Sequence, residues 1–296
     1  MAPLEAPPAA PETGRPSFAG LLGWMQDDLA AALDAYLRNP PGPLSEIARA
    51  ASDPRAFFEA RFQLGPTMTG HFTGYYEPEL PGALEPSDAF PVPIHAMPSG
   101  LVTAPRAEIE PLLAGHEIAW LRDEVDRFFL QVQGSGRIRL EDGGTLRVRF
   151  AGRNGHSYRS IGKLLVERGV FDADIDAETL KTWLRADPVR GRAVMAENPS
   201  YVMFVALDLP LESGPMGTLC PLSGGRSLAV DPEQTPLGTP VWVETDGISR
   251  LCIAQDTGAA IRGSGRADLF FGTGDAAGRA AGRFNHPGRF TPLLPR

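Results

Sequence analysis

The sequence AQDTGAAI at residues 254–261 is followed closely by RADLFFGTG at residues 266–274. A related segment, LAVDP, lies upstream at residues 228–232. Each segment places one aspartate at the end or edge of a short apolar run that Gly or Pro interrupts, which is typical of a strand that ends in a turn. No lysine lies between the first and the last of these aspartates to neutralise them. We therefore interpret the carboxylates as candidates for catalysis rather than as turn caps alone. The three aspartates are Asp231, Asp256 and Asp268.

Five other motifs accompany this segment in a fixed order. They are HFTGYYEP at 71–78, LQVQGSG at 130–136, AGRNGHSYRSIGK at 151–163, NPSYVMF at 198–204 and AGRFNHPGR at 281–289. Together with the aspartate segment they resemble the membrane-bound lytic murein transglycosylase A family, and the resemblance runs from about Phe62 to the end of the chain.

The resemblance implies an architecture that the residue pattern alone leaves coarser. Pattern by itself predicts a mainly β protein with a few helices and two domains. The resemblance implies a double-psi β-barrel catalytic domain built from both chain ends, residues 17–82 and 198–296. A smaller β-barrel, residues 83–197, would be inserted as a substrate-binding domain, with a groove between the two.

Bulk composition limits the classes of function. The 296 residues are 43% hydrophobic and 22% charged, as in a globular protein with room for two ordinary domains. The net charge of −8 argues against a nucleic-acid partner. No apolar run is long enough to span a membrane.

The N-terminal segment is rich in Ala and Pro. Residues 1–16 have no basic n-region and no apolar h-region, so we expect a flexible leader rather than a signal peptide. The family acts outside the cytoplasm, so the resemblance implies a periplasmic protein whose signal has been removed; association with the outer membrane stays open. The only cysteines, Cys220 and Cys252, cannot carry an N-terminal lipid. They form either a disulfide or two buried thiols.

Local patterns predict the individual elements. Helical spacing and helix stop signals predict helices at 18–36, 44–51, 54–62, 160–168, 177–184 and 189–197. The apolar run 128–132 indicates a strand, and a hairpin follows from alternation in 137–140 and 146–150 around an Asp-Gly-Gly turn. The hairpin would carry apolar side chains on one face and four arginines on the other.

The family reaction assigns roles to the aspartates. A lytic transglycosylase needs one carboxyl, because the C6 hydroxyl of N-acetylmuramic acid attacks its own C1 and no activated water is required. Asp268 matches the family's acid/base, and its apolar neighbours Leu269, Phe270 and Phe271 would raise its pKa, whereas Arg266 would lower it. Asp256 would be an electrostatic partner or a turn cap. Asp231, before a proline, is mainly structural with a supporting role left open.

Substrate contacts rest on the motifs. Aromatic rings and amides suit sugar faces, hydroxyls and N-acetyl groups, and residues 137–163 hold seven basic residues against two acidic ones, which suits the carboxylates of peptidoglycan. A solvated strand face would explain the same arginines. We assign substrate binding to Tyr75, Tyr76, Gln131, Gln133, Gly134, Ser135, Tyr158, Arg159 and Ser160, with Gln131 and Gln133 expected on one strand face.

Three rival functions remain open from the sequence. An aspartic peptidase would use the Asp-Thr-Gly turn at Asp256, but the chain has one such turn and would have to dimerise. A glycan-binding module would use the same fold without chemistry. A muramidase would add water with a second carboxylate, Asp256 or Glu77. We expect no cofactor and no metal, a monomer that acts on peptidoglycan strands, and recruitment by wall-synthesis or division proteins.

Overall fold

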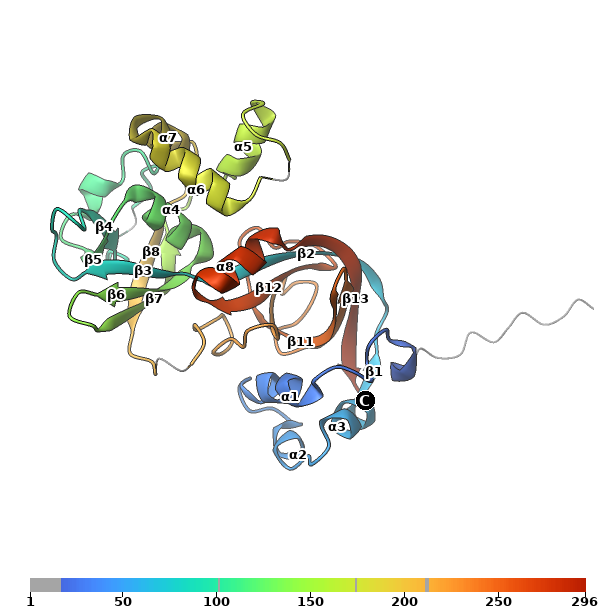
Figure 1. Cartoon of the computed structure of the whole chain (residues 1–296). Coiled ribbons are helices and arrows are strands. Elements are labelled where there is room, and N and C mark those ends of the chain that lie inside the picture. Colours follow the sequence, from blue (N-terminus) through green and yellow to red (C-terminus); the bar gives the residue numbers. More distant parts are fainter. Residues whose placement is uncertain (1–16, 101, 174, 211–212) are drawn as a thin grey trace, which may run out of the picture.

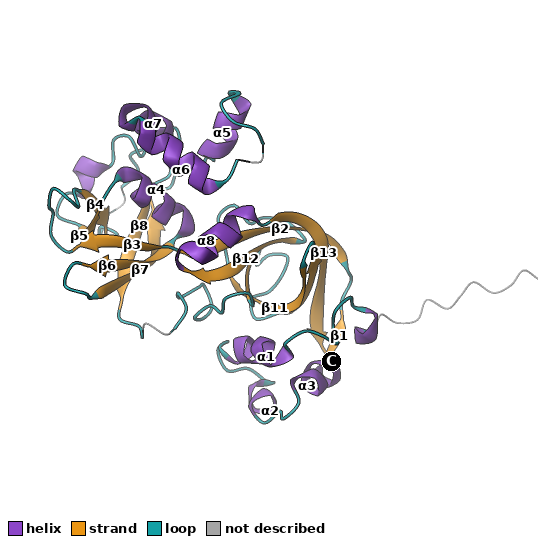
Figure 2. Cartoon of the chain, viewed as in Figure 1, coloured by secondary structure: helices purple, strands orange, loops and turns teal. Residues whose placement is uncertain are grey.

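The structure is a computed structural model that describes residues 17–100, 102–173, 175–210 and 213–296. The expected leader, residues 1–16, lies outside the described residues. The fold is mixed α/β with more strand than helix, and its strands form two separate sheets (Figures 1 and 2). The prediction of a mainly β fold is confirmed only in part, because strand exceeds helix but the fold is mixed α/β. Both chain ends do contribute strands to one sheet, as expected.

The first sheet joins the two ends of the chain. Its strand order is β1-β13-β10-β11-β9-β12-β2, and β13 also pairs with β2, which links the last strand of the series back to the second. The helix α8, Gly274–Arg283, packs on β2 and β12 (Figure 1). The strands are β1 Phe62–Leu64, β2 Met68–Glu77, β9 Ser227–Val230, β10 Pro240–Thr245, β11 Ile248–Asp256, β12 Arg266–Thr273 and β13 Asn285–Pro295.

The second sheet comes from the middle of the chain. Its order is β4-β5-β3-β6-β7-β8, and an isolated bridge from Ala96 to Phe204 brings the segment after β4 back to β8. The strands are β3 Glu79–Ala83, β4 Val92–His95, β5 Glu117–Leu121, β6 Ser135–Leu140, β7 Thr145–Arg153 and β8 Val202–Leu207. Strands β2 and β3 are separated by Pro78 alone, so Glu77 ends the first sheet where the second begins.

The remaining helices form two groups. The N-terminal group lies beside β11 and β1, and the middle group lies by the second sheet (Figure 1). The N-terminal group comprises η1 Phe18–Gly20, α1 Leu29–Leu37, α2 Ser45–Arg49 and α3 Pro54–Arg61. The middle group comprises η2 Glu110–Leu113, α4 Glu124–Gln133, α5 Ile161–Glu167, α6 Ala177–Ala186 and α7 Pro188–Ala196.

Each part of the fold has its own apolar core. Trp24 and Phe58 from the N-terminal segment pack against Trp242 on the outside of the first sheet. The interior of that sheet holds Phe72 and Phe290, whose rings are stacked. A third cluster fills the space beneath the second sheet, and a fourth joins α4 to α5, α6 and α7.

Two predicted elements are wrong. The expected helix 18–36 is interrupted, because Gly23 adopts a φ of 82° and α1 begins only after Asp28, whose carboxylate accepts from Ala31 N. The expected strand 128–132 is part of helix α4. Asp123 caps the start of α4 by accepting from Asp126 N, and Gly134 ends it with a φ of 78°. These capping signals outweigh the short apolar run.

The hairpin is confirmed. Strands β6 and β7 pair antiparallel with Arg137 opposite Arg147, and Ile138 and Val148 point into the core of the second sheet. The helices predicted over 44–51, 54–62, 160–168, 177–184 and 189–197 correspond to α2, α3, α5, α6 and α7 with shifts of a few residues at their ends. Within the part of the chain that the structure describes, no helix is both long and apolar enough to cross a membrane.

Candidate active site

The candidate site forms where β2 and β12 run parallel to each other. Asp268 pairs in register with Thr73, and Phe270 pairs with Tyr75. Side chains alternate along a strand, so Asp268 and Phe270 share one face of β12, whereas Leu269 belongs to the core on the other face. Two strands distant in sequence thus present their polar side chains together.

Asp268 is a partly buried carboxyl held by one hydroxyl. Thr73 Oγ1 donates to Asp268 Oδ1 at 2.8 Å, and Arg266 Nη2 donates to the same Thr73 oxygen at 2.7 Å. The pKa of Asp268 is raised from 3.8 to about 6, mainly by burial and also by the nearby Asp256, whereas Thr73 and Arg266 act to lower it. A carboxyl with this pKa can both donate and accept a proton near neutral pH.

The expected apolar wall is built differently. Phe270 packs against Tyr75 with ring centroids 5.3 Å apart, on the face that carries Asp268. Leu269 and Phe271 belong to the core cluster of the first sheet instead. Because side chains alternate along the strand, Phe270 is the one of the three predicted apolar neighbours that lies on the same face of β12 as the Asp268 carboxyl.

Asp256 ends β11 and is held by three donors. Tyr75 Oη donates to Oδ2 at 2.9 Å, and Thr218 donates to Oδ1 from its backbone N and its Oγ1, both at 2.9 Å. Burial raises the pKa of Asp256 in spite of these bonds. Burial and the neighbouring Asp256 hold the pKa of Tyr75 well above its usual value, so the phenol stays a neutral donor.

Asp231 has a different environment. Its carboxylate accepts from Gly263 N at 2.8 Å and Glu233 N at 3.2 Å, and Arg262 lies 3.6 Å away. The hydrogen bond from Gly263 is the main cause of its lowered pKa. Asp231 therefore fastens the loop between β11 and β12, and its hydrogen bonds do not join it to Asp256 or Asp268.

Residues 71–205 match the MltA specific insert domain, and residues 226–294 match the 3D domain. Among solved structures, the membrane-bound lytic murein transglycosylase from Agrobacterium tumefaciens superposes with a TM-score of 0.82 at 31% identity. That alignment covers 95% of this chain and 97% of the other. The chain belongs to the membrane-bound lytic murein transglycosylase A family.

Two further members of this family bear on the site. The membrane-bound lytic murein transglycosylase A of Vibrio cholerae is 34% identical over 240 residues, which are 75% of this chain and 64% of that protein. E. coli MltA with bound chitohexaose has a TM-score of 0.78 at 28% identity, over 96% of this chain and 93% of the other. The chain thus spans less than two thirds of the length of its curated relative.

In this member of the lytic transglycosylase A family, Tyr76 lies where the two sheets meet. Its backbone N donates to Gln133 Oε1 of α4 at 3.2 Å, and its hydroxyl accepts from Lys181 Nζ of α6 at 3.3 Å. Lys181 also lies over the Phe129 ring, 5.1 Å from its centroid. Tyr76 and Gln133 therefore connect the first sheet to the helices of the middle part.

Gln131 and Gln133 do not share a face. Because both lie on helix α4, two residues apart, their side chains point about 200° apart around the helix axis. Gln131 is buried; its Oε1 accepts from Arg106 Nη1 at 2.6 Å and its Nε2 donates to Val202 O at 2.8 Å. The prediction of two amides on one strand face is wrong, and Gln131 stabilises the interior of the second sheet.

The other predicted contact residues lie at the ends of helices and strands or in the segment before α5. Ser160 caps α5 by accepting from Lys163 N at 3.3 Å, and Arg159 N donates to Asn198 Oδ1 at 3.1 Å. Tyr158 beside them is an exposed aromatic residue. Gly134 ends α4, and Ser135 opens β6. Tyr158 is the one aromatic residue of this group, and its ring is available to stack on a sugar.

Two of the four hairpin arginines, Arg137 and Arg147, do not lie on a solvated face, whereas Arg139 and Arg149 are exposed. Glu77 is buried at the junction of β2 and β3, and its Oε2 accepts from Arg137 Nε at 2.8 Å and from Thr273 Oγ1 at 2.7 Å. Arg147, equally buried, reaches Glu77 Oε1 at 3.4 Å. Both arginines therefore tie the second sheet to the first through one carboxylate. The alternating pattern on its own could not distinguish this role from exposure.

Two residues of the site, Thr73 and Thr218, were not predicted from the sequence. The motif at 71–78 did carry a signal, because Thr73, Tyr75 and Glu77 are spaced by two and share one face of β2. The pairing of β2 with β12 could not be read from that spacing. Thr218 lies outside any regular element, and nothing in its local sequence marks it as a partner of Asp256.

The two cysteines are separate buried thiols in this structure. Cys220 Sγ lies 3.8 Å from Asn39 Oδ1, and Cys252 Sγ lies 3.8 Å from Gly225 O. Burial raises the pKa of Cys220 to about 11 and that of Cys252 to about 12, so neither is a reactive thiolate at neutral pH. Among the described residues, no cluster of three His, Cys, Asp or Glu side chains suits a metal ion.

Proposed function

We propose that this protein is a peptidoglycan lytic transglycosylase. It cleaves the β-1,4 bond between N-acetylmuramic acid and N-acetylglucosamine and leaves a 1,6-anhydro end. The observation that carries the proposal is the environment of Asp268, a partly buried carboxyl with a pKa of about 6 in a chain of this family. The relative from A. tumefaciens is named a lytic murein transglycosylase, and the E. coli relative was solved with a bound chitohexaose.

In the first step, protonated Asp268 donates its proton to the glycosidic oxygen. The bond from C1 to that oxygen breaks, and the N-acetylglucosamine leaves with the bonding electron pair. Thr73 occupies Oδ1 of Asp268, so we assign the transferred proton to Oδ2. The hydrogen bond from Thr73 fixes the plane of the carboxyl and holds Oδ2 toward the substrate.

In the second step, the C6 hydroxyl of the muramic acid attacks C1 of the same sugar. Its proton passes to the Asp268 carboxylate, which restores the acid for the next cycle. No water is consumed, and one carboxyl serves both steps because the nucleophile is already part of the bound substrate.

Asp256 stabilises positive charge that develops at C1. Its Oδ1 accepts two bonds from Thr218 and its Oδ2 accepts one from Tyr75, so the carboxylate is oriented and engaged on both oxygens. This arrangement makes it a poor base for activating water, which argues against Asp256 as the second carboxylate of a muramidase. The charge of Asp256 also helps to raise the pKa of Asp268.

The fold divides into two functional parts in this proposal. We assign residues 17–82 and 198–296 to a double-psi β-barrel catalytic domain, an interpretation that the link from β13 back to β2 supports. Residues 83–197 form the inserted domain, and the glycan lies along the boundary near Tyr75, Tyr76 and Gln133. We place the protein in the periplasm, acting on the cell wall.

Product analysis tests the proposal. Purified peptidoglycan is digested with the wild type, with Asp268→Asn and with the matched control Asp231→Asn, and soluble products are identified by mass spectrometry. We expect 1,6-anhydromuramic ends from the wild type and Asp231→Asn, and none from Asp268→Asn. Reducing ends would identify a hydrolase. Glycan binding without any soluble product from the wild type would identify a binding module.

A further inference from the structure

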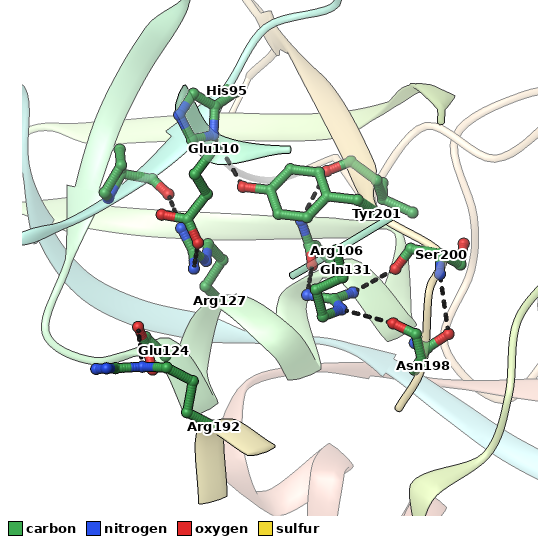
Figure 3. Close-up of polar contacts among 12 residues, drawn as sticks. His95, Arg106, Glu110, Glu124, Arg127, Gln131, Arg192, Asn198, Ser200 and Tyr201 are labelled. Carbon is green, nitrogen blue, oxygen red and sulfur yellow. Dashed lines mark hydrogen bonds and ion pairs between the residues drawn. The ribbon is translucent and has the colours of Figure 1, made fainter. Parts of the chain in front are cut away.

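A cavity of about 340 Å³ lies away from the candidate active site, where η2, α4 and α7 meet. Three arginines and two glutamates line it, together with small apolar side chains of α7 such as Val189 and Ala193. Figure 3 shows the charged residues on facing elements, Arg106, Glu110, Glu124, Arg127 and Arg192. None of these side chains bonds to Asp256 or Asp268. The volume falls in the range of small-molecule sites.

Both glutamates are already paired. Arg192 Nε lies 3.0 and 2.9 Å from the two carboxylate oxygens of Glu124, and Arg127 pairs with Glu110 (Figure 3). Three arginines against two glutamates leave the walls with one net positive charge. That charge is carried by Arg106.

Arg106 has neutral acceptors for its hydrogen bonds. Its Nε donates to Asn198 O at 3.1 Å, its Nη1 to Gln131 Oε1 at 2.6 Å, and its Nη2 to Ser200 O at 2.6 Å (Figure 3). A guanidinium has five N–H donors, so two remain beyond these three bonds. Burial and the neighbouring Arg127 lower the pKa of Arg106 to about 10, as expected for a cation without a carboxylate.

Arg127 is also incompletely satisfied. Its side chain is 6% exposed, and its buried Nε has no hydrogen-bond partner among the described residues. Arg106 and Arg127 lie over the ring of Tyr201, at 5.3 and 5.7 Å from its centroid, which fixes both guanidinium groups in place. Arg106, which has no carboxylate partner, is thus a fixed cation at the cavity beside Arg127, which pairs with Glu110. Together they form a preorganised site for an anion, because a buried cation without a counter-ion is otherwise costly.

We propose that this cavity binds the carboxylate of a small ligand, such as the terminal carboxylate of a short peptide. One net positive charge matches a singly charged carboxylate, and the two glutamates in the walls would oppose a doubly charged phosphate. The apolar surface from α7 accommodates a short side chain such as a methyl group. The inference stands apart from the proposed cleavage reaction, since it uses none of the same residues.

Calorimetric titration of the full chain tests the proposal with two matched probes, N-acetyl-D-Ala-D-Ala and its C-terminal amide. We expect saturable binding of the acid and at least about tenfold weaker binding of the amide, because the amide lacks the charge. A third probe, N-acetyl-L-Ala-L-Ala, distinguishes two possible sources of the carboxylate, the cell-wall peptides and protein or peptide C-termini in general. Preference for the D-form points to the peptides of the cell wall, and equal binding points to peptide ends in general.

Two variants change the charge of the cavity in opposite directions. Arg192→Gln removes one cation and leaves Glu124 unpaired, so the acid should bind about tenfold more weakly; Glu124→Gln should bind it more tightly. Arg139→Gln is the matched control. Arg139 of the hairpin forms an ion pair with Glu79 of β3 that is about as exposed as the pair between Arg192 and Glu124. Equal binding of acid and amide, wild-type affinity in Arg192→Gln, or no saturable binding of either acid would overturn the proposal.

Discussion

Replacement of Asp268 by Asn should stabilise the folded protein at neutral pH while it abolishes activity. Burial raises the pKa of Asp268 from 3.8 to about 6, so the folded state binds a proton more tightly than the unfolded state. Above both pKa values the charged carboxylate costs stability, and that cost disappears when the pH falls below the unfolded value. The uncharged amide avoids the cost at every pH.

The size of the effect follows from the two pKa values. The difference between the folded pKa of about 6 and the unfolded pKa of 3.8 corresponds to about 3 kcal/mol in the free energy of unfolding at pH 7.5. Because the side chain retains some contact with solvent, we expect about half of this or more. For a chain of this size the thermal unfolding midpoint would rise by about 5 °C at pH 7.5. At pH 3.5 the wild type and the variant should unfold at nearly the same temperature.

The assay is thermal unfolding of both proteins across this pH range, followed by circular dichroism. Asp231→Asn serves as the opposite control. Hydrogen bonding lowers the pKa of Asp231, so its charge contributes stability that is present at neutral pH and lost as the pH falls. That variant should unfold at a lower temperature than the wild type at pH 7.5. An Asp268→Asn variant less stable than the wild type at pH 7.5 would show that the charged carboxylate does not destabilise the fold.

Three other variants follow from the same contacts. Thr73→Val removes the bond that lowers the pKa of Asp268, so the alkaline limb of the pH–rate profile should move to higher pH; a limb that stays in place would contradict this. Tyr75→Phe leaves Asp256 Oδ2 without its donor, so kcat should fall about tenfold or more; a wild-type kcat would remove Asp256 from the mechanism. Glu77→Gln leaves buried Arg147 unpaired and should cost about 3 kcal/mol or more in urea unfolding. Its control is Glu79→Gln, whose exposed pair with Arg139 should contribute about 1 kcal/mol or less; equal losses in the two variants would count against the buried network.

The sequence predicts elements whose signals are local. The hairpin of β6 and β7 follows from alternation and a turn, and α5, α6 and α7 follow from helical spacing. Helix α4 carried equally local signals in Asp123 and Gly134, but the apolar run from Phe128 to Val132 also fits a buried strand. Periodicity cannot decide between the two over so few residues.

The site itself depends on contacts between distant parts of the chain. Asp268 and Asp256 were identified through family motifs, but their partners come from the β2 strand about two hundred residues earlier and from the loop at Thr218. Arg147 shows the same limit, because alternation places it on a polar face and only the junction of the two sheets buries it against Glu77. Strand pairing across such separations leaves no trace in local spacing.

In the proposed mechanism, one carboxyl cleaves the glycan without consuming water. The most direct test is digestion of purified peptidoglycan in water enriched in oxygen-18, with mass spectrometry of the muramic ends. We predict anhydro ends that carry no label, because the ring closes through the sugar's own O6. Muramic ends that are heavier by one labelled water would show that water attacks C1, and they would contradict the mechanism assigned to Asp268.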